Sequence, residues 1–240
     1  MLTAPQNPGA GLASVRHRIQ QAALAAGRDP AAITLVAVSK GQPAAQLRAA
    51  IRAGQADFGE NYLQEAAGKL AELAGEQACW HFIGSLQANK TREVAALFDW
   101  VHTVDRERIA RRLNDQRSPH AAPLQVCLQV RLGDEPTKSG VDPAELASLA
   151  TAVASMPRLR LRGLMCLPPE ETAPERQRGW FRQLAGLRDA LNASGHQLDV
   201  LSMGMSNDLE QAIAEGATHV RVGTAVFGAR PGGTEHASTT

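Results

Sequence analysis

A lysine at the end of an apolar run is the residue of this chain with the clearest chemical potential. Residues 33–38, Ile-Thr-Leu-Val-Ala-Val, have the composition of a buried β-strand, and Ser39 and Lys40 follow directly. A lysine at the end of a buried strand costs free energy unless the protein uses its charge or its amine. An amine deprotonates when it is desolvated and can then attack an aldehyde to form a Schiff base. Lys40 is therefore a candidate nucleophile.

Lysine is scarce in this chain, which gives Lys40 further weight. Of the 25 lysine and arginine residues only four are lysines, so arginine supplies the other 21. A lysine at a strand end is thus less expected as ordinary surface charge. The alternative is that Lys40 extends its ammonium group to solvent and pairs there with a carboxylate. The four lysines are Lys40, Lys69, Lys90 and Lys138.

Two later segments have the composition of anion-binding loops. Residues 202–208, Ser-Met-Gly-Met-Ser-Asn-Asp, combine a glycine with Ser206 near an expected helix start. The free N–H groups and the dipole at a helix N-terminus favour a phosphate group. Residues 221–224, Arg-Val-Gly-Thr, offer a cation, an uncrowded backbone and a hydroxyl group. The alternative for both segments is structural, with glycines that form turns and a serine that caps a helix.

A repeated pattern positions these segments: a short apolar run, a turn and an amphipathic helix. The pattern occurs eight times, and the runs between the helices have the length and composition of buried strands. The strands are expected at residues 33–40, 57–61, 80–84, 100–104, 124–130, 159–165, 199–204 and 219–224.

Helices are expected from apolar residues spaced three or four positions apart. The first is predicted at residues 10–26, ahead of the first strand, with Gly27 as its C-terminal stop. Asp105 is a candidate N-cap. Residues 142–145, Asp-Pro-Ala-Glu, have the composition of a capping box with proline at the first helical position. The helix after the second strand is expected to bury Leu63, Ala67, Leu70 and Leu73.

Eight strand–helix units in 240 residues describe a closed barrel better than an open sheet. The predicted fold class is α/β, a single (β/α)8 TIM-type barrel with an extra N-terminal helix. The barrel is assigned to residues 10–230, with a disordered leader at residues 1–9 and a disordered tail at residues 231–240. A doubly wound parallel sheet is the alternative.

Composition excludes several classes of function. The 25 basic and 24 acidic residues leave a net charge of +1, unlike a nucleic-acid binder. The chain has no apolar stretch near the roughly 20 residues of a membrane span and no signal peptide pattern. Its three cysteines and seven histidines are scattered, which predicts reduced thiols, no metal site and a cytoplasmic protein. A monomer is expected because no long apolar patch demands a partner.

A barrel would bring Lys40 and the two anion-binding loops together. The loops after strands seven and eight of such barrels commonly bind phosphate groups, and strand one is adjacent to strand eight once the barrel closes. An aldehyde that carries a phosphate group would satisfy both ends. Pyridoxal 5'-phosphate (PLP), held as a Schiff base on Lys40, is a compound of that kind.

The sequence also resembles a known family, the PLP homeostasis proteins or YggS/PROSC family, whose barrel is similar to the alanine racemase N-terminal domain. The resemblance covers about residues 33–230 and rests on six motifs in the same order. The motifs are Val36-Ala37-Val38-Ser39-Lys40, Phe58-Gly59-Glu60-Asn61-Tyr62-Leu63-Gln64-Glu65, His81-Phe82-Ile83-Gly84, Leu86-Gln87-Ala88-Asn89-Lys90, Ser202-Met203-Gly204-Met205-Ser206 and Val220-Arg221-Val222-Gly223-Thr224.

The resemblance implies roles for individual residues at the strand ends. Lys40 matches the lysine that carries PLP. Ser206, Gly223 and Thr224 match the phosphate-binding segments.

Further matches concern the cofactor ring. Arg221 matches an arginine close to the cofactor, and Asn61 matches a polar residue near the ring. Met165 is a candidate for packing against the ring, with ordinary core packing as the alternative. Lys138 is either a second amine that receives or passes on the aldehyde, or a solvated loop lysine. The chain has Ser85 where the family usually has a proline or a larger residue.

Two observations favour a carrier over an enzyme. Racemases with this barrel take an opposing tyrosine base from an added domain, whereas the single tyrosine of this chain, Tyr62, follows the second strand. Two-base racemisation needs proton donors on both faces of the substrate carbon. In addition, the charge of Arg221 near the pyridine nitrogen would disfavour ring protonation and weaken the electron sink.

The function predicted from the sequence is PLP homeostasis. The chain is expected to bind PLP as a Schiff base on Lys40 and to store it or deliver it to recipient PLP enzymes, with little or no amino-acid turnover. One alternative is a PLP-dependent racemase-like enzyme with narrow amino-acid specificity. Another is a metabolic barrel whose Lys40 forms imines with sugar phosphates.

Overall fold

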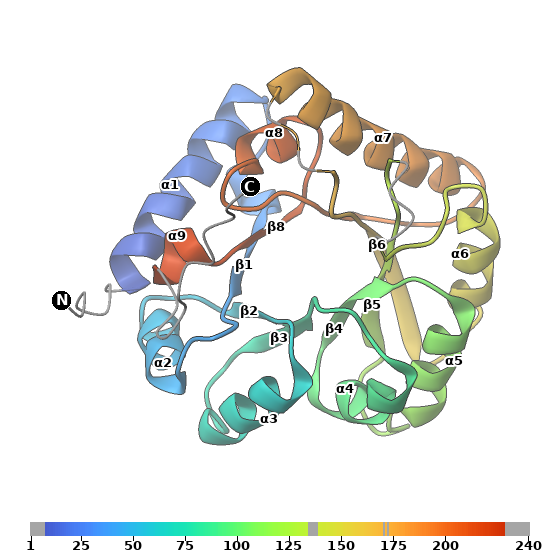
Figure 1. The fold of residues 1–240 in the computed structure, drawn as a ribbon, viewed down its shortest axis with the longest axis horizontal. Coiled ribbons are helices and arrows are strands. Elements are labelled where there is room, and N and C mark those ends of the chain that lie inside the picture. Colours follow the sequence, from blue (N-terminus) through green and yellow to red (C-terminus); the bar gives the residue numbers. More distant parts are fainter. Residues whose placement is uncertain (1–7, 134–138, 170, 172, 229–240) are drawn as a thin grey trace, which may run out of the picture.

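Eight parallel strands pair in chain order and close into a barrel, with helices around the outside (Figure 1). The computed structural model describes residues 8–133, 139–169, 171 and 173–228. The predicted (β/α)8 barrel is therefore confirmed, and the doubly wound sheet is excluded because β1 pairs with β8. The strands are β1 Thr34–Val38, β2 Asp57–Glu60, β3 Cys79–Phe82, β4 Trp100–Val104, β5 Leu124–Gln129, β6 Leu159–Met165, β7 Val200–Ser202 and β8 His219–Val222.

Each strand is followed by a helix, and one more helix precedes the barrel. This extra helix, α1, packs against α2, α8 and α9 on the outside of the closing seam. The helices are α1 Pro8–Ala25, α2 Ala44–Arg52, α3 Leu63–Glu72, α4 Thr91–Leu97, α5 Glu107–Gln116, α6 Leu146–Ala154, α7 Pro174–Ala193, α8 Leu209–Ala214 and α9 Thr224–Phe227, with short 3-10 helices η1 Pro30–Ala32 and η2 Ala88–Lys90.

The seam between β1 and β8 closes the barrel through four residue pairs, from Thr34 opposite His219 to Ala37 opposite Val222. The run at residues 35–37 is buried on both faces, because one side of β1 meets the helices and the other faces the interior of the barrel. The chain segments that follow β1 and β8 consequently emerge side by side. These segments carry Lys40 and Gly223.

The main apolar core lies between the sheet and the helices, where it includes Phe58, Leu128 and Leu164. The interior of the barrel differs from the usual filling of branched apolar side chains. Among the described residues, a small separate cluster of Cys127, Met165 and Val200 packs apart from that core, with Trp100 beside it.

Much of the remaining barrel interior is polar. His81 and His102 are fully buried, and their rings lie 5.1 Å apart between centroids. His219 and Trp100 lie within ring-contact distance of both. The fold therefore separates an apolar core outside the sheet from a largely polar network inside it.

Two predicted helix caps are wrong. The N-cap of α5 is Arg106 rather than Asp105, whose carboxylate accepts hydrogen bonds from the Arg106 guanidinium instead. Helix α6 begins at Leu146, three residues later than the capping-box pattern predicts. The carboxylate of Asp142 accepts a hydrogen bond from the amide of Ala144 at 2.9 Å, so it closes a turn ahead of the helix.

The buried face of α3 also differs from the prediction. Ala66 is buried where the spacing favoured Ala67, and the next position on that face is Lys69, which is 6% exposed. A buried lysine hidden on an apolar helix face is an unexpected feature of this barrel.

The first helix begins at Pro8, so the last two residues of the predicted leader belong to α1. Residues 1–7, the predicted tail and Lys138 lie outside the described residues. Among the helices of the described part of the chain, none combines the length and the apolar composition needed to cross a bilayer.

Candidate functional site

Lys40 lies in a tight turn at the carboxyl end of β1. The amide of Ser39 continues the strand ladder by donating to the carbonyl of Gly59 at 2.9 Å. The amide of Gln42 then donates to the carbonyl of Ser39 at 3.0 Å and closes the turn. Gly41 has a φ of 72°, a left-handed conformation that glycine adopts at the third position of type II turns. Lys40 is half-buried at the second position of this turn.

A pocket joins Lys40 to the segment after β8. Its lining includes Lys40, Gln42, Gly223 and Thr224. The pocket encloses about 30 Å³, enough for a group of a few atoms rather than for a whole cofactor. The structure thus brings together three of the residues that the sequence predicted for one site.

Gly223 is needed where the two segments approach each other. A Cβ atom at this position would lie 3.1 Å from the carbonyl oxygen of Val38 and 3.3 Å from its Cβ. Thr224 follows as the exposed first residue of α9. The backbone of β8 can therefore lie against β1 while its next amide and hydroxyl groups remain open to a ligand.

Arg221 is buried in β8, two residues before Gly223. Its Nη1 donates to Ser202 Oγ at 2.7 Å, and its Nη2 donates to the carbonyl oxygen of Cys166 at 2.9 Å. Burial lowers the pKa of this guanidinium, but an arginine stays charged in proteins. The side chain is therefore a fixed cation at the ends of β6 and β7, inside the barrel.

A chain of hydrogen bonds continues from Ser202 through the barrel interior. His102 Nδ1 lies 2.7 Å from Ser202 Oγ, and His102 Nε2 lies 2.9 Å from His81 Nδ1. His81 Nε2 in turn lies 3.0 Å from Asp57 Oδ1. Burial, followed by the neighbouring histidines, holds the pKa of His102 well below its usual value, so this imidazole is neutral at pH 7.

Asn61 lies directly after β2 and contacts the next loop. Its Oδ1 atom is buried and has no hydrogen-bond partner among the described residues. A Cβ atom on Gly84 would lie 2.0 Å from the carbonyl oxygen of Asn61, so the loops after β2 and β3 touch through their backbones. An unpaired buried amide oxygen at the barrel mouth is a candidate acceptor for a ligand.

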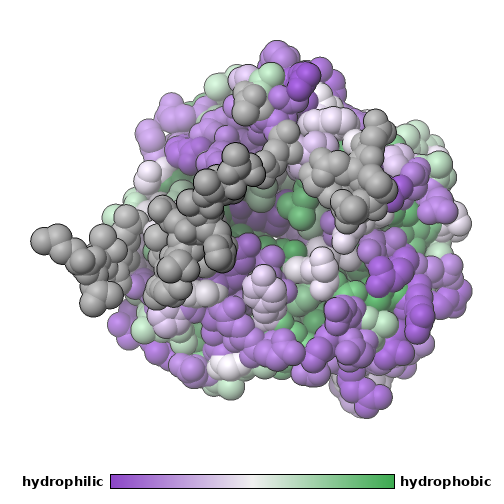
Figure 2. Space-filling model, in the orientation of Figure 1, coloured by the Kyte–Doolittle hydropathy of each residue, from purple (hydrophilic) through white to green (hydrophobic). Residues whose placement is uncertain are grey.

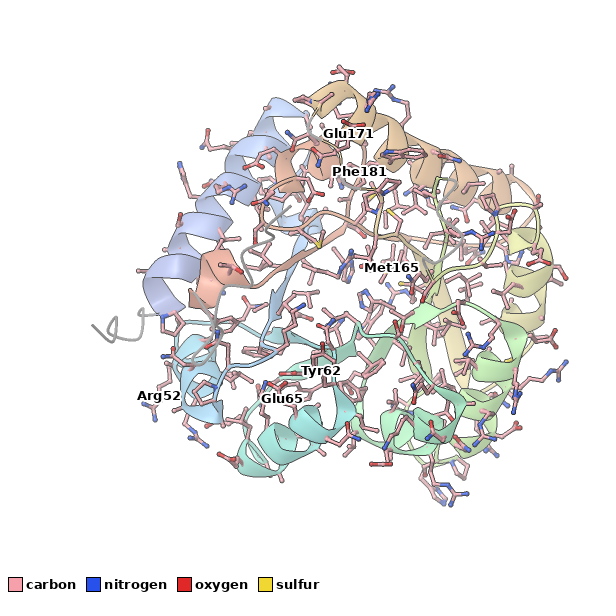
Figure 3. The ribbon with its side chains drawn as sticks, in the orientation of Figure 1. Arg52, Tyr62, Glu65, Met165, Glu171 and Phe181 are labelled. Carbon is pink, nitrogen blue, oxygen red and sulfur yellow. The ribbon has the colours of Figure 1, made fainter. Side chains whose placement is uncertain are left out.

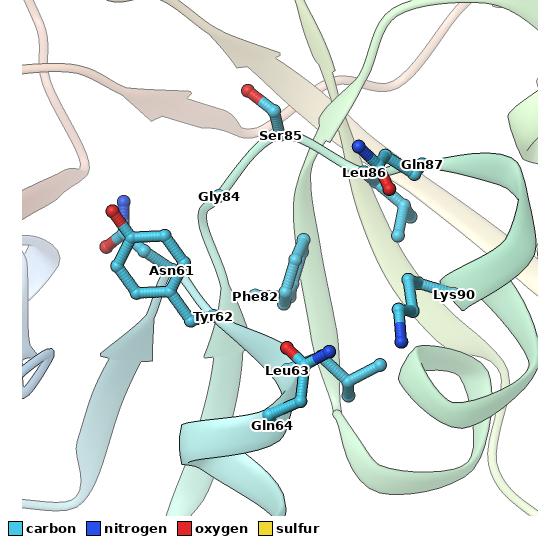
Figure 4. Close-up of a pocket in the computed structure, with 10 residues that line it drawn as sticks. All are labelled: Asn61, Tyr62, Leu63, Gln64, Phe82, Gly84, Ser85, Leu86, Gln87 and Lys90. Atoms are coloured by element: carbon cyan, nitrogen blue, oxygen red, sulfur yellow. The ribbon is translucent and has the colours of Figure 1, made fainter.

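A second pocket of about 370 Å³ lies beside Asn61, between the loops after β2 and β3. Figure 4 shows Tyr62 and Lys90 on opposite sides of it, with the exposed Ser85 at its rim. Lys90 is half-buried rather than fully solvated. Ser85, where the resemblance led us to expect a departure from the family pattern, thus lies at the edge of this pocket.

Two predicted site residues, Met165 and Ser206, lie outside the lining of the small Lys40 pocket. Met165 is fully buried beside Cys127 and Val200, where it could pack in the core or support a ligand above it (Figure 3). Ser206 is half-buried before α8, and its carbonyl oxygen accepts a hydrogen bond from Arg18 Nη2 at 2.9 Å. Neither residue lines the pocket that contains Lys40.

Three charged residues around the Lys40 turn, Glu60, Glu65 and Lys69, are absent from the sequence-based site. Glu60 and Lys69 form a buried ion pair at 2.7 Å, and Glu65 lies at the start of α3 (Figure 3). The sequence feature that could have indicated this network is the position of Lys69, three residues after Ala66 on the apolar face of the helix.

The opposite end of the barrel brings together three groups of the metal-ligand type. Asp57, Cys79 and His81 each place one ligand atom within 4.8 Å of the others, because strand register sets Asp57 opposite Cys79. Zinc sites use these residue types. However, Asp57 already bonds His81, and burial raises the pKa of the Cys79 thiol. These groups satisfy one another, and we assign no cation to them.

Figure 2 shows largely hydrophilic residues around the rim of the barrel face seen in Figure 1, with a hollow between them.

Comparisons with known proteins show the family of the chain. The family model described as alanine racemase, N-terminal domain, matches residues 11–231. A pyridoxal phosphate homeostasis protein of Pseudomonas aeruginosa is 56% identical over 219 residues, which cover 91% of this chain and 94% of that protein. The chain belongs to this family of pyridoxal phosphate homeostasis proteins.

Solved structures support the family assignment. PipY of Synechococcus elongatus PCC7942, a structure with PLP bound, is 38% identical and has a TM-score of 0.81, with 92% of this chain and all of that chain covered. Alanine racemase of E. faecalis is 22% identical with a TM-score of 0.63, and the match covers 90% of this chain and 58% of the racemase. The racemase therefore shares the barrel fold.

Proposed function

We propose that this chain binds PLP on Lys40 at the mouth of the barrel and stores or delivers it, with little or no turnover of amino acids. The observation that carries this proposal is the pocket that Lys40 shares with Gly223 and Thr224. A nucleophilic amine and an open amide–hydroxyl pair suit the two ends of a phosphorylated aldehyde. The names of the relatives and the PLP in PipY support the same conclusion.

Each predicted residue receives a role in this proposal. Lys40 would hold the aldehyde as a Schiff base, and Gly223 and Thr224 would bind the phosphate group, with Ser206 from the neighbouring loop. Asn61 would accept a hydrogen bond near the ring through its Oδ1, which has no partner among the described residues. Met165 would form part of the apolar support beneath it.

Arg221 favours a carrier over an enzyme. PLP catalyses amino-acid reactions when its protonated ring withdraws electrons from the substrate carbon. A permanent cation near the ring nitrogen disfavours that proton. The hydrogen bonds to Ser202 and Cys166 keep the guanidinium from moving away. The alternative, a racemase-like enzyme with narrow specificity, would need a second proton donor opposite Lys40.

The test is the visible spectrum of the purified protein, followed by borohydride reduction and peptide mapping. We expect a yellow protein whose reduced adduct maps to Lys40 and disappears in the Lys40→Ala variant. The matched control is Lys90→Ala, which changes another half-buried lysine. A colourless wild-type protein that takes up no added PLP would overturn the proposal.

A panel of amino acids then separates carrier from enzyme. We expect no racemisation or decarboxylation by the PLP-loaded protein and measurable transfer of PLP to an apo-enzyme that depends on it. Robust turnover of any amino acid would establish the racemase-like alternative. Lys138→Ala tests whether a second amine takes part in the transfer.

We further propose that the protein is a cytoplasmic monomer. Its three cysteines are free, and Cys127 and Cys166 are buried, as suits a reducing compartment. Light scattering of the purified protein would measure its mass, and a dimer would contradict the second part of this proposal.

A further inference from the structure

The peptide groups on both sides of Lys40 are hydrogen-bonded to charged side chains of one helix. The carbonyl oxygen of Ser39 accepts a hydrogen bond from Lys69 Nζ at 2.6 Å, and the amide of Gly41 donates to Glu65 Oε1 at 2.5 Å. Lys69 and Glu65 both belong to α3 and form an ion pair of 2.5 Å. This pair therefore spans the turn from one side of Lys40 to the other.

Glu60, at the end of β2, belongs to the same network. Its Oε1 accepts a hydrogen bond from Ser39 Oγ at 2.6 Å and lies 2.7 Å from Lys69 Nζ. The side chain of Glu60 is fully buried and that of Lys69 is 7% exposed. Burial raises the pKa of the Glu60 carboxyl group, whose Oε2 has no hydrogen-bond partner in the described part of the chain. Both charges are thus held largely out of water.

A buried ionic network is a poor source of stability. The loss of hydration offsets much of the attraction, and apolar side chains of similar volume often stabilise a protein equally or better. Helix α3 already buries Leu63 and Ala66 on this face. What the charges add is a set of short, directional bonds to the two peptide groups beside Lys40.

We propose that Lys69, Glu65 and Glu60 are positioning residues that hold the Lys40 turn in its PLP-accepting geometry. They fix the carbonyl before Lys40 and the amide after it, so the lysine leaves the turn towards the pocket it shares with Gly223. This inference deepens the proposed function and rests on it for the role of the Lys40 amine.

The first test needs no cofactor. Hydrogen exchange of the Gly41 amide reports the bond to Glu65 directly. We expect Glu65→Ala to exchange at least about tenfold faster than wild type, because a hydrogen bond to a charged group is lost. Glu65→Gln keeps an acceptor oxygen and should recover much of the protection. Glu72→Ala, at an exposed position of the same helix, is the matched control and should exchange as wild type does.

A double variant, Glu60→Leu with Lys69→Met, separates positioning from folding. Single removal of Lys69 would leave a buried carboxylate without its cation and risks unfolding the chain. The apolar pair avoids this, so we expect a urea midpoint equal to or above that of wild type. Its Gly41 amide should nevertheless exchange at least about tenfold faster, since Lys69 no longer holds Glu65 and the turn.

The second test uses the PLP-loaded protein. Excess hydroxylamine captures PLP, and the loss of visible absorbance measures the rate of capture. This rate should be at least about tenfold higher in Glu65→Ala and in the double variant than in wild type. Lys90→Met should release PLP at the wild-type rate.

The outcomes distinguish the two proposals. Wild-type Gly41 exchange in both Glu65→Ala and the folded double variant would overturn the positioning role, and so would faster exchange with unchanged PLP capture. A wild-type protein that takes up no PLP would instead overturn the proposed function, and the exchange measurements would still report whether the network holds the turn.

Discussion

His102 Nδ1 lies 2.7 Å from Ser202 Oγ, and this contact joins β4 to β7 across the interior of the barrel. It is one link of a chain that begins at Arg221 and ends at Asp57. Asp57 can only accept a hydrogen bond when it is ionised, and Arg221 can only donate. With one proton on each imidazole, every bond of the chain therefore points in the same direction, from Arg221 to Asp57.

The imidazoles of the buried His102 and the half-buried His219 make the stability of the barrel depend on pH. Burial lowers the pKa of His219 to about 3 and holds that of His102 well below its usual value. Both histidines bind protons more readily in the unfolded chain, where their pKa is about 6.5. Stability should therefore fall as the pH drops below about 6.5, and the loss due to His219 should continue towards pH 3.

Urea unfolding of the PLP-free protein at pH 7 and pH 5 checks this dependence. His219 should contribute up to about 2 kcal/mol to the loss of stability between these values, so His219→Gln should lose correspondingly less than wild type. His120→Gln, at an exposed position, is the control. Equal losses in wild type and His219→Gln would show that His219 does not titrate as expected.

Ser202→Ala should destabilise the fold from inside the barrel. The substitution removes the acceptor of Arg221 Nη1 and leaves His102 Nδ1 without a partner, with both groups buried. An unsatisfied buried polar group costs about 1–3 kcal/mol. Urea unfolding at pH 7 measures the effect, and Ser194→Ala on the exposed end of α7 provides the comparison. A loss below about 0.5 kcal/mol would mean that water or a shifted side chain replaces the hydroxyl group.

Gly223→Val should weaken PLP binding more than folding. A Cβ atom would already lie 3.1 Å from the Val38 carbonyl oxygen, and the added methyl groups would press β8 away from β1 at the Lys40 pocket. If an overpacking cost of about 1–3 kcal/mol falls on the PLP-bound state, the affinity for PLP drops about 5- to 150-fold. A titration of the protein with PLP, monitored by the visible absorption of the bound cofactor, measures this affinity. Gly186→Ala, where a Cβ atom would meet nothing within 4 Å, should bind PLP as wild type does.

Gly84→Ala should disrupt the contact between two neighbouring loops. The new Cβ atom would lie 2.0 Å from the carbonyl oxygen of Asn61, so one of the two backbones must shift. We expect a loss of about 2 kcal/mol or more in urea unfolding. Gly68→Ala has open space around its Cβ position and should instead gain about 0.5–1 kcal/mol. Similar stability of the two variants would contradict the close approach.

The strands were predictable because a parallel barrel buries them on both faces. The strand predicted at residues 159–165 corresponds in full to β6, and the apolar run before Lys40 corresponds closely to β1. Eight such runs alternating with helices are compatible with few chain topologies. Because the connections between parallel strands are right-handed, these units favour a closed barrel. Helix ends were less predictable. The carboxylates of Asp105 and Asp142 had an arginine and a turn amide within reach, and those contacts replaced the expected caps.

The pocket residues and the polar network differ in how far the sequence revealed them. Lys40 and Gly223 were predictable because strand order alone makes their loops neighbours. The chain from Arg221 to Asp57 takes single residues from five strands, and none of those strands shows an unusual pattern by itself. Lys69 was equally hidden, because its partners come together only when α3 packs beside β1 and β2.

The seam between β1 and β8 also has a consequence for biosynthesis. It joins one of the first strands that the ribosome produces to the last strand of the barrel, and the pocket of Lys40 and Gly223 lies at that seam. A nascent chain contains Lys40 long before Gly223 has been translated. The pocket that the two residues share can therefore form only after the last strand has been made and the barrel has closed.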